Sequence, residues 1–207
     1  MKKTVLFVLL EQYADWEGAY LAPGILSLGK GKFSIKTVSL TKEPVHSIGG
    51  FTTLPDYDIE SAPKNFDSLV LIGGNSWRNE SAVKVMSLVN TAIKNHAVLA
   101  GICDASAFLG KNGILNDIEH TSNDLNDLKQ WAGEAYTGEA KYIKQQVVRS
   151  GNIITANGTA ALEFSREVML ALEVASESEI LGIYNFHKLG FYNSEMPEFI
   201  SEDDAPY

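Results

Sequence analysis

Short runs of apolar residues alternate along the chain with longer segments whose apolar positions recur at helical spacing. Residues 5–10, 66–72 and 98–100 have the pattern of strands that helices bury on both faces. Residues 33–40 alternate apolar and polar side chains well enough to predict another strand. Residues 45–54 predict a short strand or hairpin at the margin of the resulting sheet.

Segments with helical spacing separate these strands. Residues 16–28 predict a helix that is broken or kinked near Pro23 and Gly24, because proline lacks a backbone donor and crowds the preceding turn. Residues 79–95 predict a second helix from the spacing of their apolar side chains. Two further helices are predicted at residues 124–131 and 157–175, and two further strands at residues 145–149 and 152–155.

This alternation of strands and helices predicts an α/β fold with a mostly parallel sheet. Right-handed crossovers make the sheet doubly wound, with helices on both faces. A chain of 207 residues that is 45% hydrophobic and 21% charged suits one globular domain with a substantial core. We assign residues 1–200 to that domain and expect residues 201–207 to be a frayed acidic tail.

The charge balance excludes several classes of partner. The net charge is −9 and no cluster of Lys and Arg occurs, which argues against nucleic acid or an anionic membrane surface. No run approaches the roughly 20 apolar residues of a membrane span. The apolar run at residues 5–10 is short and is followed by polar residues, so it predicts a buried strand and no signal peptide. A single cysteine cannot form an internal disulfide, and we expect a cytoplasmic protein.

The only cysteine, Cys103, lies at the centre of a Gly-x-Cys-x-Ala sequence between a predicted strand and a helix-compatible segment. This layout is typical of a nucleophile elbow, in which a sharp turn holds the nucleophile in a strained backbone conformation. A buried cysteine that acts as a small hydrophobe is the alternative. If the elbow forms, the helix N-terminus faces the thiol, and we predict a pKa well below the usual value of about 8.5.

Two other loops are predicted to meet this elbow, because the carboxyl ends of parallel strands lie at one edge of the sheet. Glu17 follows the first strand, Gly73-Gly74 follows the strand at residues 66–72, and Cys103 follows the elbow strand. The backbone N–H groups of Gly74 and Asp104 are candidate oxyanion donors. The alternatives are an ordinary turn at Gly73-Gly74 and a helix-start role for Glu17.

Several segments resemble a known family. Residues 70–74, 100–103 and 154–164 look like the signature segments of the ThiJ/PfpI family, part of the class I glutamine amidotransferase-like superfamily. That family includes intracellular proteases, glyoxalase and deglycase proteins, and stress proteins. The resemblance implies a flavodoxin-like sandwich, Cys103 as the reactive cysteine and Glu17 as the acid that touches its sulfur. It also implies a homodimer with the pocket near the dimer interface.

The chain departs from the family pattern at the expected base. Protease-like members usually have His after the cysteine, whereas this chain has Asp104, whose charge would oppose a thiolate. Other members draw a His from the segment after the elbow helix. Here His120 is the candidate base, although the expected position lies nearer Asn123, and a structural role for His120 is the alternative. The other three histidines are predicted to be structural or surface residues: His46, His96 and His187.

We expect no metal and no cofactor. The histidines and the cysteine show no Cys-x-x-Cys or His-x-x-x-His spacing, and the loop after residue 72 lacks the ending of a P-loop. The first hypothesis is a cysteine-dependent enzyme, hydrolase or amidase-like or glyoxalase-like, acting on a small carbonyl or amide substrate. The alternative is a non-enzymatic redox or stress protein whose Cys103 is oxidised to a sulfinate that Glu17 stabilises. A binding module that uses the elbow pocket is a third possibility.

Overall fold

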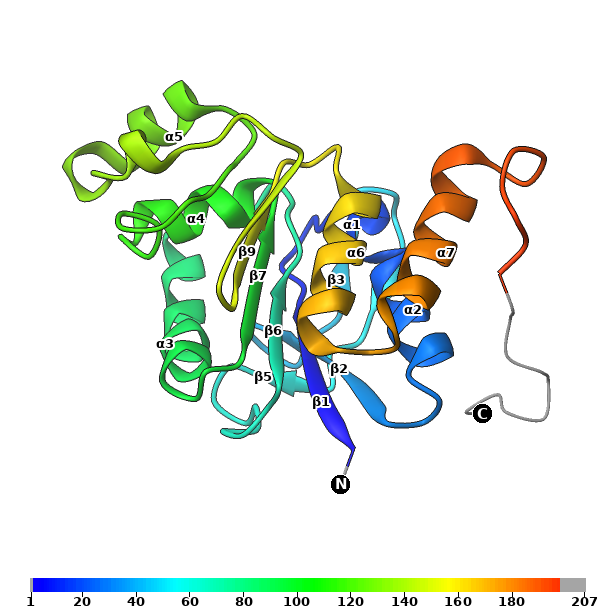
Figure 1. Ribbon diagram of the computed structural model, residues 1–207. Helices are drawn as coiled ribbons and strands as arrows, with labels where there is room; N and C mark the ends of the chain where they lie inside the picture. Colours follow the sequence, from blue (N-terminus) through cyan, green and yellow to red (C-terminus); the bar gives the residue numbers. More distant parts are fainter. Residues whose placement is uncertain (1, 198–207) are drawn as a thin grey trace.

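A mostly parallel sheet of seven strands lies at the centre of the computed structural model, which describes residues 2–197 (Figure 1). The strand order is β5-β2-β1-β6-β7-β9-β8, and each neighbouring pair is parallel except β8 and β9. This confirms the predicted doubly wound, flavodoxin-like α/β sheet. The strands are β1 (Lys3–Val8), β2 (Phe33–Ser39), β5 (Tyr57–Asp58), β6 (Ser68–Leu71), β7 (Val98–Ile102), β8 (Val147–Ser150) and β9 (Ile153–Ala156).

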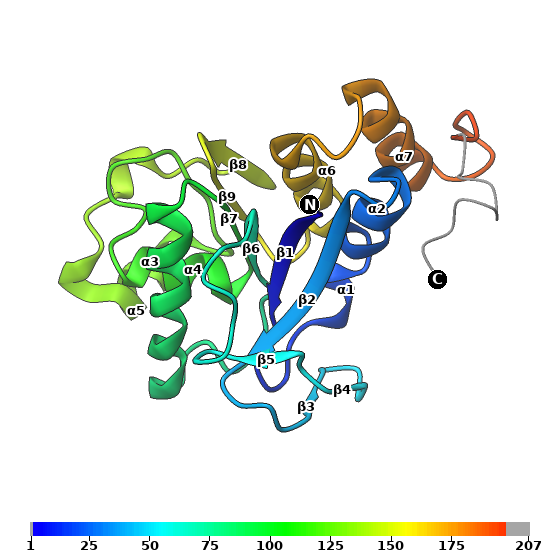
Figure 2. The ribbon, with the colours of Figure 1, turned by 90° about the horizontal axis from the view of Figure 1, so that it is seen from below.

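Helices cover both faces of this sheet, as Figure 1 and Figure 2 show. One layer contains α1 (Asp15–Gly18), α2 (Leu21–Leu28), α6 (Ala161–Leu172) and α7 (Glu177–Leu189). The other contains α3 (Met86–Lys94) and α4 (Asp104–Lys111), and α5 (Leu125–Ala132) packs on α4. A short 3₁₀ segment, Glu80–Val85, leads into α3. The two layers bury the apolar strands that the sequence pattern predicts.

Alternate residues of β1 enter two separate cores. Val5 and Phe7 pack in the core beneath α2 and α6, whereas Leu6 and Val8 pack in the core beneath α3 and α4. Side chains along a strand point to opposite faces, so a strand covered on both faces needs apolar residues at every position. This is the physical reason for the continuous apolar run at residues 5–10.

The predicted break within residues 16–28 lies at a different place. The chain breaks between α1 and α2, at residues 19–20, and Pro23 lies inside α2. Pro23 is in the first turn of that helix, where a missing N–H removes no intrahelical hydrogen bond. Gly24 lets α2 approach α6, because a Cβ there would lie 2.7 Å from Sδ of Met169. The expectation of a kink at Pro23 was therefore wrong.

Smaller elements complete the fold. The expected hairpin is present as β3 (Val45–His46) and β4 (Thr52–Thr53), but it forms a separate two-stranded sheet and does not extend the margin of the main one. Helix α5 begins after Asp124, whose side chain caps it by accepting a hydrogen bond from the N–H of Asp127. The helix predicted from residue 157 starts later, because residues 157–160 form a turn at the candidate site.

Two kinds of feature are absent from the described residues. Within residues 2–197, no helix is long and apolar enough to cross a membrane. The same residues contain no group of three or more His, Cys, Asp or Glu side chains able to hold a metal ion. The tail expected at residues 201–207 lies outside the described residues.

Candidate active site

The chain turns sharply at Cys103, between β7 and α4. Cys103 has φ = 61° and ψ = −132°, a conformation that L residues rarely adopt. Neighbouring hydrogen bonds hold the turn: the N–H of Cys103 donates to the carbonyl of Ala156 at 2.9 Å, and the Ser106 hydroxyl lies 2.8 Å from the carbonyl oxygen of Gly101. The backbone therefore forms the nucleophile elbow that the Gly-x-Cys-x-Ala sequence predicts.

A buried carboxyl group lies beside this elbow. Glu17 of α1 is completely inaccessible to solvent, and its Oε2 accepts a 2.7 Å hydrogen bond from the N–H of Gly73. Its Oε1 is buried without a hydrogen-bond partner among the described residues. A Cβ placed on Gly158 would lie 3.0 Å from Sγ of Cys103 and 3.3 Å from Oε1 of Glu17. The sulfur and the unpaired oxygen thus border one small space.

Glycine at position 73 keeps this space open on the other side. A Cβ on Gly73 would lie 2.5 Å from Cβ of Cys103 and 2.6 Å from Oε2 of Glu17. A real Cβ atom essentially never lies this close to another heavy atom. Any larger residue at position 73 would therefore separate the thiol from the carboxyl group.

Burial controls the ionisation of this pair. It raises the pKa of Glu17 to about 7, against an ordinary value of 4.5. Burial and then the Glu17 charge raise the pKa of Cys103 to about 11, although the amide of Asn123 and the N–H of Asp104 act in the opposite direction. The predicted lowering of the thiol pKa was wrong, because it considered the helix N-terminus without the desolvation of the sulfur. Two like charges repel strongly here, so the pair carries at most one negative charge near neutral pH.

Asn123 occupies the position next to the thiol where a histidine was sought. Its Nδ2 donates to Sγ of Cys103 at 3.2 Å, and its Oδ1 accepts from the N–H of Gly158 at 2.8 Å. An amide does not titrate, so Asn123 can stabilise a thiolate but cannot remove its proton. The family resemblance placed the expected histidine nearer Asn123 than His120. The hydrogen bond from Asn123 to the sulfur, however, depends on loop geometry that the sequence pattern does not encode.

The structure does not bring His120 to the thiol. The imidazole is fully buried, with Nδ1 2.8 Å from the carbonyl oxygen of Ile118 and Nε2 2.7 Å from the hydroxyl of Tyr136. The rings of Tyr136 and Tyr142 pack edge-on against it. Burial lowers the pKa of His120, which favours the neutral ring. Both ring nitrogens are engaged, and these contacts are those of a structural histidine.

One candidate oxyanion donor, Gly74, lies in the loop after β6, and the other, Asp104, directly follows Cys103 at the start of α4. Gly74 has φ = 147°, and a Cβ there would collide with the backbone of Gln12 and Tyr13. Asp104 is the first residue of α4, and the partial positive charge of its N–H next to the sulfur lowers the thiol pKa. A first-turn N–H has no intrahelical acceptor, which leaves it available to a ligand.

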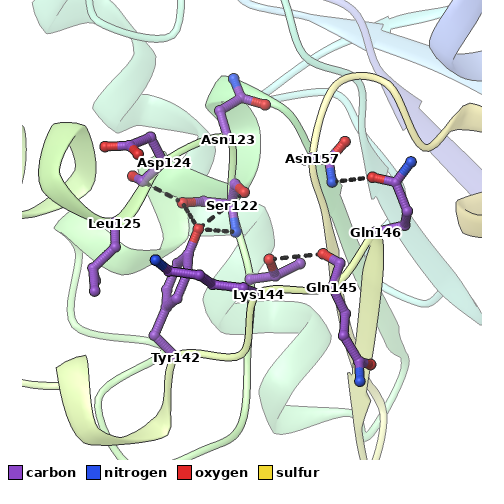
Figure 3. Close-up of a pocket in the computed structure, with 10 residues that line it drawn as sticks. Ser122, Asn123, Asp124, Leu125, Tyr142, Lys144, Gln145, Gln146 and Asn157 are labelled. Carbon is purple, nitrogen blue, oxygen red and sulfur yellow. Dashed lines mark hydrogen bonds between the residues drawn. The ribbon is translucent and has the colours of Figure 1, made fainter.

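A polar cavity of about 470 Å³ adjoins Asn123 (Figure 3). Its walls come from the loop before α5 and the segment that leads into β8. The hydroxyl of Tyr142 donates to the carbonyl of Ser122 at 3.1 Å, and Nδ2 of Asn157 donates to Oε1 of Gln146 at 2.5 Å. The lining residues are Thr121, Ser122, Asn123, Asp124, Leu125, Tyr142, Lys144, Gln145, Gln146 and Asn157.

The sequence and the fold have counterparts in known proteins. The profile of the DJ-1/PfpI family matches residues 3–171. The chain belongs to the DJ-1/PfpI family. This confirms the resemblance drawn from the segments around Gly73, Cys103 and Gly158.

Relatives within the DJ-1/PfpI family cover almost the whole chain. A Bacillus subtilis (strain 168) protein named "Uncharacterized protease YdeA" is 40% identical over 192 residues, which is 92% of this chain and 94% of that protein. The crystal structure of the DJ-1 superfamily protein Atu0886 from Agrobacterium tumefaciens is 33% identical and has a TM-score of 0.80, covering 90% of this chain and 99% of that one. The thiJ/pfpI family protein from Bacillus anthracis is 28% identical, has a TM-score of 0.84 and covers 91% of each chain.

The other histidines of this DJ-1/PfpI chain make contacts away from the elbow. His46 pairs with Glu11 on the exposed β3 strand, and Nδ1 lies 3.3 Å from Oε1. The carbonyl of His96 accepts a hydrogen bond from Asn152 at 2.8 Å. The ring of His187 packs against Tyr20, with centroids 5.0 Å apart. The side chains that lie next to the Cys103 sulfur are therefore those of Glu17 and Asn123.

Proposed function

We propose that this DJ-1/PfpI protein is a cysteine-dependent enzyme that acts on a small carbonyl compound. Cys103 is the nucleophile and Glu17 transfers its proton. The observation that carries this proposal is the buried, unpaired Oε1 of Glu17, which borders the same space as Sγ of Cys103. A buried oxygen without a hydrogen-bond partner is costly, and the thiol of Cys103 is the neighbouring group that can supply the missing hydrogen.

The proposed reaction begins with proton transfer from the thiol to the Glu17 carboxylate. The sulfur then attacks the carbonyl carbon and forms a C–S bond, while the π electrons of the C=O bond move to its oxygen. The N–H groups of Asp104 and Gly74 stabilise that oxyanion. Glu17 returns its proton to the oxygen, which completes a hemithioacetal without loss of an atom. The raised pKa of Glu17, about 7, suits a group that accepts and returns a proton near neutral pH.

The absence of an imidazole at the sulfur favours carbonyl addition over amide hydrolysis. Hydrolysis of an amide requires a general acid for the leaving nitrogen and a base for the attacking water. Among the described residues, Glu17 is the titratable side chain that shares the thiol's space, since His120 is engaged elsewhere and Asn123 does not titrate. In a glyoxalase-like reaction Glu17 then moves the proton of the hemithioacetal carbon to the neighbouring carbonyl carbon, which gives a thioester. Water hydrolyses that thioester to a 2-hydroxy acid and frees the Cys103 thiol, and no leaving nitrogen has to be protonated. Asn123 both donates to the sulfur and lines the polar cavity, although Cys103 and Glu17 are not among the residues that line it.

The test is consumption of a small 2-oxoaldehyde by the purified protein. Cys103→Ser and Glu17→Gln should each abolish turnover, because one removes the nucleophile and the other removes the proton carrier. Glu11→Gln is the matched control, since Glu11 is exposed and pairs with His46. Retained turnover in Cys103→Ser would overturn the proposal, as would cleavage of amide substrates by the wild type at comparable rates.

A redox role is the second candidate, supported by the groups around the sulfur. The amide of Asn123 already donates to Sγ, and a protonated Glu17 offers a second donor at Oε1. Two donors would hold the oxygens of a sulfinate formed by peroxide. Mass spectrometry after peroxide treatment should then show a stable gain of two oxygen atoms on Cys103 that Glu17→Leu, which has no donor at this position, loses. Overoxidation to the sulfonate in the wild type would count against this role.

We also propose that the protein forms a homodimer through the surface around α1 and the β3–β4 hairpin. Large apolar side chains are exposed there: Trp16 is 48% exposed, Ile48 43% and Phe51 68%. Such a patch is typical of an interaction surface. Trp16 donates a 3.2 Å hydrogen bond to the carbonyl of Gly158, so this surface adjoins the candidate site. The cytoplasmic location stays a prediction from the sequence.

A further inference from the structure

The guanidinium of Arg78 lies between two carboxylates from different helices. Its Nε and Nη2 donate to Asp104 at 2.9 and 3.3 Å, and its Nη2 and Nη1 donate to Asp127 at 2.6 and 3.1 Å. Asp104 begins α4 and Asp127 belongs to α5. Paired donors of this kind fix both the position and the orientation of a carboxylate, which a lysine cannot do.

An aromatic ring holds the same guanidinium from another direction. The centre of the Arg78 guanidinium lies 4.9 Å from the centroid of Trp131, which also belongs to α5. Lys111, at the end of α4, faces the same ring at 5.5 Å and donates to the Trp131 carbonyl at 3.1 Å. Arg78 itself lies in the loop after β6, a few residues beyond Gly73 and Gly74. It therefore connects that loop to α4 and α5.

Asp104, one of the two carboxylates that Arg78 binds, lies beside the thiol. Asp104 directly follows Cys103, and its side chain is only 19% exposed. The charged side chains that act on the thiol are Glu17, from α1, and Asp104, from α4, and both carboxylates raise its pKa. Asn123 lies against the sulfur but carries no charge. Arg78 neutralises Asp104 at 2.9 Å, so it offsets one of the two charges that oppose a thiolate.

We propose that Arg78 is a positioning residue for Cys103: its paired hydrogen bonds to Asp104 hold the first N–H of α4 beside the sulfur, and its positive charge offsets that of the neighbouring carboxylate. Arg78 does not contact the sulfur and acts through Asp104. The proposal rests on the proposed function only in taking Cys103 as the reacting group.

The test measures the rate of Cys103 alkylation by iodoacetamide as a function of pH. Arg78→Met should shift the profile to higher pH, because Asp104 then bears an unpaired charge beside the thiol. At a fixed pH below the thiol pKa, we expect the rate to fall about threefold to tenfold, since one pKa unit corresponds to a factor of about ten. Asp104→Asn should shift the profile to lower pH. In the Asp104→Asn background, Arg78→Met should produce no further shift.

Two more variants separate this effect from general damage. Asp127→Asn removes the other carboxylate and leaves the pairing with Asp104, so its profile should stay near wild type. Arg78→Lys keeps the charge and loses the paired donors, and should shift the profile less than Arg78→Met. If Arg78→Met does not fold, Arg78→Lys carries the test.

The proposal fails if folded Arg78 variants keep the wild-type profile, or if the Arg78→Met shift persists without the Asp104 charge. Alkylation requires no turnover, so this result is independent of whether any carbonyl substrate is consumed. If the protein consumes no 2-oxoaldehyde but the single and combined variants of Arg78 and Asp104 shift the alkylation profile as expected, only the proposed function is contradicted.

Discussion

The N–H of Gly73 donates a 2.7 Å hydrogen bond to Oε2 of Glu17 and fixes the carboxyl group with its other oxygen toward Cys103. This one contact joins the loop after β6 to α1. It satisfies one oxygen and leaves Oε1 buried without a partner. The geometry therefore couples the protonation of Glu17 to that of the neighbouring thiol.

The first prediction is that Glu17→Gln lowers the pKa of Cys103. The Glu17 carboxylate is ionised above its pKa of about 7, and its charge is one of the causes that raise the thiol pKa to about 11. The glutamine variant keeps the shape and removes the charge. Alkylation by iodoacetamide at pH 8 to 9 should accelerate, about tenfold for each pKa unit gained. Glu11→Gln should not change the rate, and an unchanged or slower reaction in Glu17→Gln would contradict the charge coupling.

The second prediction concerns the space around the sulfur. Gly158→Ala places a methyl group 3.0 Å from Sγ, so Cys103 or the loop must shift. We expect slower alkylation and a loss of stability of about 1–3 kcal/mol from overpacking.

Gly182→Ala is the matched control for this substitution. Gly182 lies in α7, and a Cβ there would meet nothing within 4 Å. Alanine should raise the stability by about 0.5–1 kcal/mol through its higher helix propensity and leave Cys103 unaffected. If both variants react alike with iodoacetamide, the space at Gly158 has no bearing on the thiol.

The third prediction is a pH dependence of stability that originates at Glu17. A carboxyl group whose pKa is raised from 4.5 to about 7 binds its proton more tightly in the folded than in the unfolded protein. Its contribution is fully present below pH 4.5 and is lost as the pH rises to about 7. The resulting loss is on the order of 3 kcal/mol, since one pKa unit is about 1.4 kcal/mol. Urea unfolding at pH 5 and pH 8 should show this loss in the wild type, and Glu17→Gln should lack it.

The sequence pattern predicts the sheet and the elbow for physical reasons that act locally. Strands buried on both faces require continuous apolar runs, and three of these runs end shortly before Glu17, Gly73 and Cys103. Parallel strands bring their carboxyl ends to one edge. The meeting of Glu17 with Cys103 therefore follows from strand order, together with the family resemblance.

The rest of the site depends on features that periodicity does not contain. Asn123 reaches the sulfur through an irregular loop, and Arg78 meets Asp104 across 26 positions of the chain. The direction of the Cys103 pKa shift depends on burial, which is a property of the assembled fold. These contacts are set by tertiary packing, and a single sequence carries no regular signal for them.

The fourth prediction tests the proposed dimer surface. Phe51→Ser removes an apolar side chain that is 68% exposed on the β3–β4 side. We expect it to shift the protein toward the monomer in light scattering at micromolar concentration. Ile93→Ser is the control, because Ile93 is 40% exposed on α3, on the opposite face of the sheet. Equal masses for wild type and Phe51→Ser would exclude this surface as the main interface.

The last prediction assigns His120 a structural role. Tyr136→Phe removes the hydroxyl that lies 2.7 Å from Nε2 and leaves a buried ring nitrogen without a partner. The expected cost is about 1–3 kcal/mol of unfolding free energy, the desolvation penalty of an unsatisfied polar group. The alkylation profile of Cys103 should stay unchanged, because the structure shows no contact between His120 and the sulfur among the described residues. Denaturation and alkylation measured on the same sample separate the two effects. A displaced alkylation profile at unchanged stability would instead place His120 in the proton chemistry of the thiol.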